Sequence, residues 1–336
     1  MYKLTLNPLD QTPKYKQIVQ SVITDIERGK LRAGSQLPSI SEMSEEYYLA
    51  RGTVEKSYRE LRERGYINSV QGKGYYVLSR EHDKLQILLV FNKLSSYKKE
   101  IYYAFLDGLG NRATVDLQIH HYSAELFRQI MERSLGKYNF YVVMPHFTTT
   151  TLPEDYLSIL HTIPPDELVL LDKDLPALKQ PCLAVYQDFA RDIGESLDSL
   201  ADDLVKYPRI RMILPSDDNY PIEIDRGFRH FCAHHNKEST VRENALDEVM
   251  EPGMCYVVVR ETDLVELVKK IRQTPYLLGR EIGIISFNET PLKELLGMTV
   301  ITTDFPHMGR TAATMLLEGK REKVRNPFTV IRRGSI

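Results

Sequence analysis

Polar and basic side chains gather between Leu37 and Val77, where their types and spacing fit the chemistry of nucleic-acid binding. Arg51, Thr53 and Lys56 occupy the first two turns of a predicted helix. Guanidinium, ammonium and hydroxyl groups at the start of a helix bind phosphates and the edges of base pairs. The segment is therefore predicted to bind double-stranded DNA.

The elements that position these groups are two helices followed by a hairpin. Ser39 and Glu42 form an S-x-x-E capping box at the start of a short helix. A second helix begins at Arg51 and stops at Gly65. Tyr66 to Val77, with Gln-Gly-Lys-Gly at its centre, indicates a β-hairpin with a basic tip. Helix, recognition helix and wing in this order are typical of a winged helix-turn-helix, which usually binds duplex DNA.

Specific DNA contacts follow from the way such a head docks. A recognition helix enters the major groove by its N-terminal end, so Arg51, Thr53 and Lys56 are expected to meet base edges and phosphates. Ser39 and Ser41 begin the preceding helix. They can offer hydroxyl and backbone N–H groups to a phosphate.

The hairpin tip is expected to act as the wing. Gly72 and Gly74 permit a tight turn and a close approach, which places Lys73 in or over the minor groove. The predicted DNA-binding residues are Ser39, Ser41, Arg51, Thr53, Glu55, Lys56, Gly72, Lys73 and Gly74.

Length and charge suggest that this head is attached to a different kind of body. The chain has 336 residues, enough for two or three domains, and a formal net charge of −2. Residues 1–80 hold 13 Lys/Arg and 9 Asp/Glu, whereas the remainder holds 31 and 37. A mildly basic head on an acidic body fits one domain that meets phosphate and another that does not.

Several other classes of protein are not expected. The sequence has no apolar run of about 18 residues and no signal-peptide core, so we expect a cytoplasmic protein without a membrane partner. Cys182, Cys232 and Cys255 are too scattered for a disulfide framework or a zinc site. His230 and His234 are spaced i, i+4 on a predicted helix without a carboxylate at motif spacing, so neither a metal nor a cofactor is expected.

From Leu85 onward, short apolar β-rich runs alternate with helical patterns. The first run is Ile87–Phe91 and the last is Ile282–Phe287. Short apolar strands separated by helices predict parallel sheets covered on both faces, hence an α/β body. About 250 residues of this pattern suit two lobes. We therefore expect a DNA-binding domain at 1–79, a linker at 80–84 and a two-lobed effector-binding and dimerisation domain at 85–336.

The head resembles that of the GntR family of bacterial transcription regulators. Two positions depart from it, because many members carry Arg where Ser41 and Glu55 stand. A Glu facing DNA can accept a hydrogen bond from cytosine, but Glu55 could instead pair with Arg51 or Arg59 across one helical turn. The resemblance is carried by Pro13–Ile18, Gly34–Ser39, Arg51–Val54, Leu61–Ile67 and Gln71–Gly74.

The body resembles the sugar-sensing domain of the lac repressor family, which has a type I periplasmic-binding-protein fold. Together, head and body look like the L-arabinose-repressor type of GntR regulator. The carrying segments are short but ordered: Leu170–Asp174, Val185–Asp188, Arg226–Phe228, Ile285–Thr290 and Thr299–Gly309.

The second resemblance implies a sugar site between the lobes, near the carboxyl ends of strands. Arg260 stands where many relatives have Asn, which could indicate an acidic ligand. Arg also binds vicinal hydroxyls, and the adjacent Glu261 could neutralise it, so we favour a neutral sugar. The predicted effector-binding residues are Asp172, Tyr186, Arg226, Arg260, Asn288, Asp304 and Phe305.

The sequence thus predicts a dimeric transcription regulator, a repressor rather than an activator, whose operator affinity is controlled by a small sugar. L-fucose and L-arabinose are the first candidates. Two alternatives remain: a sugar-processing α/β enzyme fused to a DNA-binding head, and a DNA-binding protein without an effector. No catalytic motif has a defensible context, so an enzyme is not expected.

Overall fold

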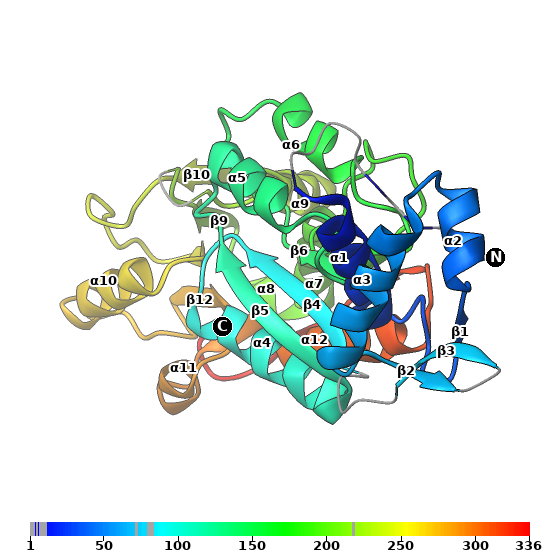
Figure 1. The fold of residues 1–336 in the computed structure, drawn as a ribbon. Coiled ribbons are helices and arrows are strands. Elements are labelled where there is room, and N and C mark those ends of the chain that lie inside the picture. The colour runs from blue at the N-terminus through cyan, green and yellow to red at the C-terminus, as the bar shows by residue number, and fades with distance from the viewer. Residues whose placement is uncertain (1–3, 5, 7–11, 71–72, 79–83, 217–218) are drawn as a thin grey trace.

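The computed structural model describes residues 4, 6, 12–70, 73–78, 84–216 and 219–336. They form a small head and two larger lobes (Figure 1). The predicted winged helix-turn-helix is present as helices, a short strand and a hairpin. Its elements are α1 (Lys14–Glu27), β1 (Gln36–Leu37), α2 (Ile40–Glu46), α3 (Arg51–Glu63), β2 (Ile67–Val70) and β3 (Gly74–Val77).

Apolar periodicity and one capping box explain the fold of the head. Val22 of α1 and Val54 and Tyr58 of α3 are fully buried in one core, because they recur on one face of each helix. The Ser39 hydroxyl accepts from Glu42 N at 3.2 Å, and the Glu42 carboxylate accepts from Ser39 N at 2.7 Å. This capping box begins α2 where the sequence predicted it. The strands pair antiparallel in the order β1-β3-β2.

Lobe 1 is a six-stranded parallel sheet in the order β14-β8-β7-β6-β4-β5. Most of it comes from one stretch of chain, but a helix and a strand return from near the C-terminus. Its elements are β4 (Leu85–Phe91), α4 (Ser96–Leu109), η1 (Gly110–Arg112), β5 (Ala113–Ile119), α5 (Ala124–Ser134), β6 (Phe140–Val143), α6 (Pro153–Leu160), β7 (Leu168–Asp172), β8 (Leu183–Tyr186), α12 (Phe305–Leu317) and β14 (Lys323–Arg325).

Lobe 2 is a second six-stranded sheet, in the order β10-β9-β11-β12-β13-β15, with the last strand antiparallel to β13. Its elements are α7 (Phe189–Ser199), α8 (Ala201–Leu204), β9 (Arg209–Ile213), α9 (Glu223–His234), β10 (Glu238–Arg242), β11 (Met254–Val258), α10 (Glu261–Arg272), β12 (Ile282–Phe287), α11 (Pro291–Leu295), β13 (Thr299–Thr303) and β15 (Phe328–Ile331).

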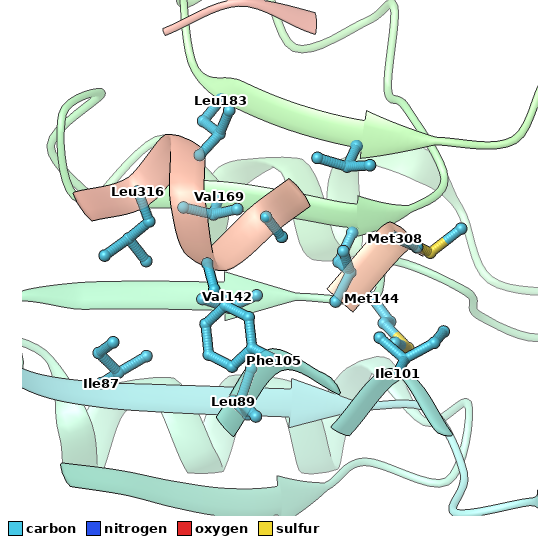
Figure 2. Close-up of a cluster of buried hydrophobic side chains, with 14 of the residues drawn as sticks. Ile87, Leu89, Ile101, Phe105, Val142, Met144, Val169, Leu183, Met308 and Leu316 are labelled. Atoms are coloured by element: carbon cyan, nitrogen blue, oxygen red, sulfur yellow. The ribbon is translucent and has the colours of Figure 1, made fainter. Parts of the chain in front are cut away.

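Helices cover both faces of the lobe 1 sheet, as the continuous apolar runs predicted. Ile87 and Leu89 of β4 pack with Phe105 of α4 and Met308 of α12 (Figure 2). The alternate residue Leu88 packs on the opposite face, where α5 and α6 contribute side chains. A strand buried on both faces must be apolar at every position, which is the pattern read from the sequence.

A glycine allows two helices to approach closely in each lobe. A Cβ at Gly309 of α12 would overlap the Ile101 carbonyl oxygen of α4. In lobe 2, a Cβ at Gly227 of α9 would overlap the Ala190 carbonyl oxygen of α7. Both positions therefore require glycine for packing.

Three crossings join the lobes, and Asn326 contacts all of them. Its backbone N donates to Tyr186 O at 2.7 Å, which ties the first crossing. Its side-chain amide donates to Thr303 Oγ1 and to Asp304 O, both at 2.9 Å, at the second. Pro327, the next residue, continues the third crossing and accepts from Asp304 N at 3.0 Å. These hydrogen bonds thus connect the three crossings to one another.

Candidate nucleic-acid interface and ligand cavity

The recognition helix presents its predicted contacts at its N-terminal end. Arg51 and Glu55 are 70% and 51% exposed, and Arg51 Nε lies 3.1 Å from Glu55 Oε1. Of the two roles considered for Glu55, the structure shows the ion pair with Arg51 within the helix. An exposed i, i+4 pair contributes at most about 0.5 kcal/mol, so Arg51 can leave it for a base edge at little cost.

Lys56 points toward α1. Its ammonium lies 3.7 Å from the centre of the Tyr15 ring, a cation–π contact at an exposed position. The contact holds the Lys56 ammonium beside α1. We therefore expect Lys56 to bind a DNA phosphate rather than a base edge. Ser41 and Thr53 remain at least partly exposed on the same end of the head.

The wing is a fixed hairpin with an exposed lysine. Gln36 Nε2 of β1 donates to Lys73 O at 2.7 Å, which ties the tip to the rest of the sheet. Gly74 has φ 110°, a conformation that requires glycine, and supports the predicted tight turn. Gly72 lies outside the described residues.

A cavity of about 190 Å³ lies between the lobes, at the carboxyl ends of β4, β7 and β12. This is the position where open α/β sheets bind ligands. Aromatic and amide groups dominate its walls. The aromatic lining is Tyr97, Tyr122, Phe189, Tyr220, Phe287, Phe305 and Phe328; the polar lining is Asn92, Lys93, Ser95, Lys98, His146, Asp172, Gln187, Asn219 and Asn288.

Asp172 is the centre of the polar network. Its carboxylate accepts from Lys98 Nζ at 2.5 Å, from His146 Nε2 at 2.6 Å and from Gln187 Nε2 at 2.6 Å. Burial opposes ionisation of Asp172, but Lys98 and the His146 hydrogen bond outweigh it and hold the pKa of Asp172 well below its usual range. Burial lowers the pKa of His146 despite Asp172, so the imidazole is neutral. The group therefore combines one anion, one cation and one neutral ring.

A buried lysine also supports the cavity from lobe 2. Lys293, 1% exposed, donates from Nζ to Phe287 O at 2.6 Å and to Asn288 O at 2.9 Å. Burial lowers the pKa of Lys293. These bonds hold the end of β12 where Asn288, at φ 60°, enters the cavity lining.

Asn92, at the end of β4, carries an unsatisfied acceptor in the cavity wall. The residue is 3% exposed, and its Oδ1 has no hydrogen-bond partner among the described residues. A buried acceptor normally has a donor, so a ligand hydroxyl is a suitable partner. Sequence reasoning missed Asn92, although its position after the first strand of an α/β lobe is a usable signal.

Asp172, Asn288 and Phe305 are the predicted effector residues that line the cavity. Arg226 and Arg260 do not line it. Arg226 is exposed on α9, and Arg260 is turned into a bond from its Nε to Asp263 Oδ2 at 2.9 Å. Ile224, in the first turn of α9, does line the cavity.

Tyr186 and Asp304 also do not line the cavity. Both lie at crossings between the lobes, where they make other contacts. The Tyr186 ring packs on the core of lobe 1, and its carbonyl accepts from Asn326 N. The Asp304 carboxylate caps α12 by accepting from His307 N at 2.7 Å. Sequence reasoning placed both residues at crossings and expected them to bind the effector, whereas neither lines this cavity.

Lys98, His146 and Gln187 were missed by sequence reasoning. They come from the first turn of α4, a loop after β6 and the first crossing. Ser95 caps α4 by accepting from Lys98 N at 3.4 Å, a detectable N-cap signal. The loop histidine gave no comparable signal.

The remaining sequence expectations concern metals and membranes. His235 Nε2 lies 2.8 Å from Asp198 Oδ1, and no group of three or more possible metal ligands occurs within the described part of the chain. The three cysteines are buried and free. In the ranges that the structure describes, no helix is long and apolar enough to cross a membrane.

A winged helix-turn-helix head joined to a two-lobed α/β body defines a class of DNA-binding transcription regulators. Residues 14–77 match the model of the bacterial regulatory proteins, gntR family. The head is therefore a GntR-type DNA-binding domain.

Curated relatives are also transcription regulators. The repressor YtrA of Bacillus subtilis is 27% identical over 124 residues, 37% of this chain and 91% of the relative. The regulator TreR of the same species is 26% identical over 204 residues, 58% of this chain and 76% of the relative. The arabinose metabolism repressor of Geobacillus stearothermophilus is 32% identical, but over 22% of this chain and 20% of the relative.

Solved structures share the fold of the body at low identity. The trehalose repressor of Escherichia coli has a TM-score of 0.59 at 16% identity, covering 74% of this chain and 100% of that one. The lac repressor dimer bound to operator has a TM-score of 0.59 at 14% identity, covering 75% and 94%. The body thus has the fold of LacI-type regulators, as its sequence predicted.

Proposed function

We propose that the chain is a repressor that binds operator DNA through its head and is controlled by a small neutral sugar in the cavity between its lobes. The buried network around Asp172 carries this proposal. A carboxylate held by three hydrogen bonds, with an unsatisfied Asn92 acceptor in the same cavity wall, is a preorganised site for a ligand rich in hydroxyl groups.

The apolar walls fit the same ligand. Tyr97 and Phe305 stack with ring centres 5.1 Å apart and an interplanar angle of 22°, and both line the cavity. Such rings cover the C–H face of a sugar, while amides such as Asn92, Gln187 and Asn288 serve its hydroxyls. Several similar proteins are named as repressors of trehalose, arabinose or mannosyl-D-glycerate systems.

Charge pairing favours a neutral ligand. Lys98 and Asp172 neutralise each other within the wall, and His146 is neutral. Lys93 remains near the cavity with its ammonium 5.8 Å from the Tyr122 ring centre. L-arabinose and L-fucose are the first ligands to test, and a sugar phosphate tests whether Lys93 attracts an anion.

Operator binding is proposed to involve a homodimer. Two heads would occupy half-sites about one helical turn apart, roughly 34–36 Å, or a multiple of it. We infer a head ending near residue 79, a linker at 80–84 and a body at 85–336, since β3 ends at Val77 and β4 begins at Leu85. The protein would act in the cytoplasm, where its operator lies.

Calorimetric titration with a panel of monosaccharides and sugar phosphates tests the effector, and repeating operator titrations with each sugar tests the switch. A sugar that binds and changes operator affinity is expected. Turnover of a sugar would instead establish an enzyme, and unchanged operator affinity with every sugar would exclude sugar control.

The DNA interface is tested by Arg51→Ala, with Arg64→Ala at the far end of the same helix as control. The first variant should weaken operator binding and relax specificity at one base pair by ~1–3 kcal/mol. The control should bind normally. Equal affinities of the two variants would contradict the placement of the recognition helix.

A further inference from the structure

Arg28, at the C-terminal end of α1, reaches from the head to lobe 1. Its Nη2 donates to Tyr138 O at 3.1 Å and lies 3.3 Å from Glu167 Oε2. The two side chains are 13% and 17% exposed, in contrast to the 70% and 51% of the Arg51–Glu55 pair. A largely buried ion pair is poorly screened by solvent, so losing one partner has a larger effect than at the surface.

The contact lies at the beginning of two adjacent strands. Tyr138 precedes β6 and Glu167 immediately precedes β7. Tyr141 N of β6 also donates to Glu167 O at 2.8 Å. Arg28 thus binds the amino end of a parallel strand pair at the centre of lobe 1.

The same two strands lead to the cavity at their other end. β7 ends at Asp172, and His146 follows β6; these side chains are joined by the 2.6 Å hydrogen bond. The five residues of β7 span roughly 17 Å at ~3.3 Å per residue. Arg28 and the cavity are therefore at opposite ends of one short, buried strand pair.

The contact of Arg28 is one of few links between the head and the lobes in the part of the chain that is described, and Lys30 of the head also acts electrostatically on Glu167. No helix or strand of the head packs extensively against one of the lobes there. Arg28 Nε is buried without a hydrogen-bond partner among the residues that the structure describes, so the interface is not fully satisfied in this arrangement. A small interface of this kind permits relative motion of domains.

We propose that the contact of Arg28 with Tyr138 and Glu167 is the docking interface that orients the head on lobe 1, and that a ligand at Asp172 and His146 acts on the head through β6, β7 and this contact. The docking part stands on the observed contacts. The coupling part rests on the proposed function, because it requires a ligand in the cavity.

Charge reversal tests the docking part on the full chain. Arg28→Glu and Glu167→Arg should each accelerate hydrogen exchange in residues 138–141 and at the C-terminal end of α1. The double variant should restore part of the protection, because it re-forms the ion pair but not the hydrogen bond to Tyr138 O. Arg32→Glu, an exposed change four residues further on, is the matched control. Melting curves identify variants whose head has unfolded. Exchange in Arg28→Glu equal to that in Arg32→Glu, or a double variant that restores nothing, would overturn docking.

Operator titration with and without L-arabinose tests the coupling part. Arg28→Ala should bind the sugar with wild-type affinity, while the sugar's effect on operator affinity falls from the roughly 5–150-fold typical of allosteric coupling toward no change. An undiminished sugar effect would overturn coupling through Arg28. If no sugar of the panel changes the operator affinity of the wild-type protein, the proposed function and the coupling part fail together. Hydrogen exchange alone then decides whether the docking part holds.

Discussion

In each lobe, a residue with positive φ at the end of a strand lines the cavity, but the two residues are held in place by different interactions. β7 of lobe 1 ends at Asp172 with φ 73°, and β12 of lobe 2 is followed by Asn288 with φ 60°. A buried lysine holds each one. Lys98 binds the Asp172 carboxylate, whereas Lys293 binds the backbone carbonyls of Phe287 and Asn288.

This difference separates two ways of fixing a binding residue. In lobe 1 the Asp172 side chain that lines the cavity also neutralises a buried cation, so the cavity wall and the stability of the lobe depend on the same group. In lobe 2 the lysine fixes only the backbone at Phe287 and Asn288, and the Asn288 side chain lines the cavity without taking part in those bonds. Lobe 1 should therefore tolerate changes at its strand end less well than lobe 2.

The largest expected effect is the loss of the Asp172 charge. Asp172→Asn keeps a residue that accepts positive φ but leaves Lys98 buried without its anion, which should cost about 3–5 kcal/mol of unfolding free energy. Asn288→Gly should change stability by less than about 1 kcal/mol while weakening sugar binding. Urea unfolding and calorimetry measure both. Equal losses of stability would remove the distinction between the lobes.

Acid should act on the two lobes in opposite directions. Burial lowers the pKa of His120 in lobe 1 to about 4, against a bond to Met144 O that raises it. Because the folded pKa lies below the unfolded 6.5, stability is lost as pH falls from 6.5 toward 4, by at most about 3 kcal/mol. Burial raises the pKa of Asp192 in lobe 2 to about 6, although Arg325 lowers it. Since the folded protein holds that proton more tightly, acid favours folding there.

Urea unfolding at several pH values checks this opposition. His120→Phe should make the protein less sensitive to acid than the wild type, and Asp192→Asn should make it more sensitive. The same pH dependence in all three proteins would show that neither group controls acid stability.

Helix packing is expected to be equally tight in both lobes. Gly309→Ala and Gly227→Ala should each destabilise by ~1–3 kcal/mol, because the new methyl group meets a backbone carbonyl of the neighbouring helix. Gly194→Ala is the control, since its Cβ would meet nothing within 4 Å and should stabilise α7 by ~0.5–1 kcal/mol. Thermal unfolding compares the three, and destabilisation by Gly194→Ala would contradict the packing argument.

The smallest effect is expected at a positive φ outside the cavity. Tyr48, in the turn between α2 and α3, has φ 51° and is 97% exposed. Tyr48→Gly should raise the stability of the head by about 1 kcal/mol, because glycine adopts this conformation without strain. Thermal unfolding of the variant measures the gain. A loss of stability instead would show that the tyrosine has a stabilising contact.

The fold was largely predictable because its signals are local. The capping box at Ser39, the apolar face of α3 and the two-sided apolar runs each reflect one element and its burial. The family resemblance then supplied the order of the lobes. Those parts of the prediction agree with the observed head and sheets.

The cavity was only partly predictable because a sequence locates strand ends better than side-chain directions. Asp172, Asn288 and Phe305 were proposed from the family resemblance, at strand ends or at a crossing, and they line the cavity. Neighbouring residues along an extended chain point to opposite sides, so Tyr186 and Gln187 at the same crossing have different roles. His146 lies in a loop whose path depends on tertiary packing, and no local pattern indicated it.

The crossings gathered by Asn326 mean that neither lobe is a continuous piece of the chain. Lobe 1 uses residues 85–186 and 305–325, and lobe 2 uses 187–304 and 326–331. A single cut therefore never releases a whole lobe, and a fragment ending before residue 305 lacks α12 and β14 of the first sheet. Ribosomal synthesis must pass residue 325 before the sheet of lobe 1 can be completed and residue 331 before that of lobe 2 can. The cavity between the lobes is thus completed only after Phe328, the last of its lining residues in the sequence, has been made.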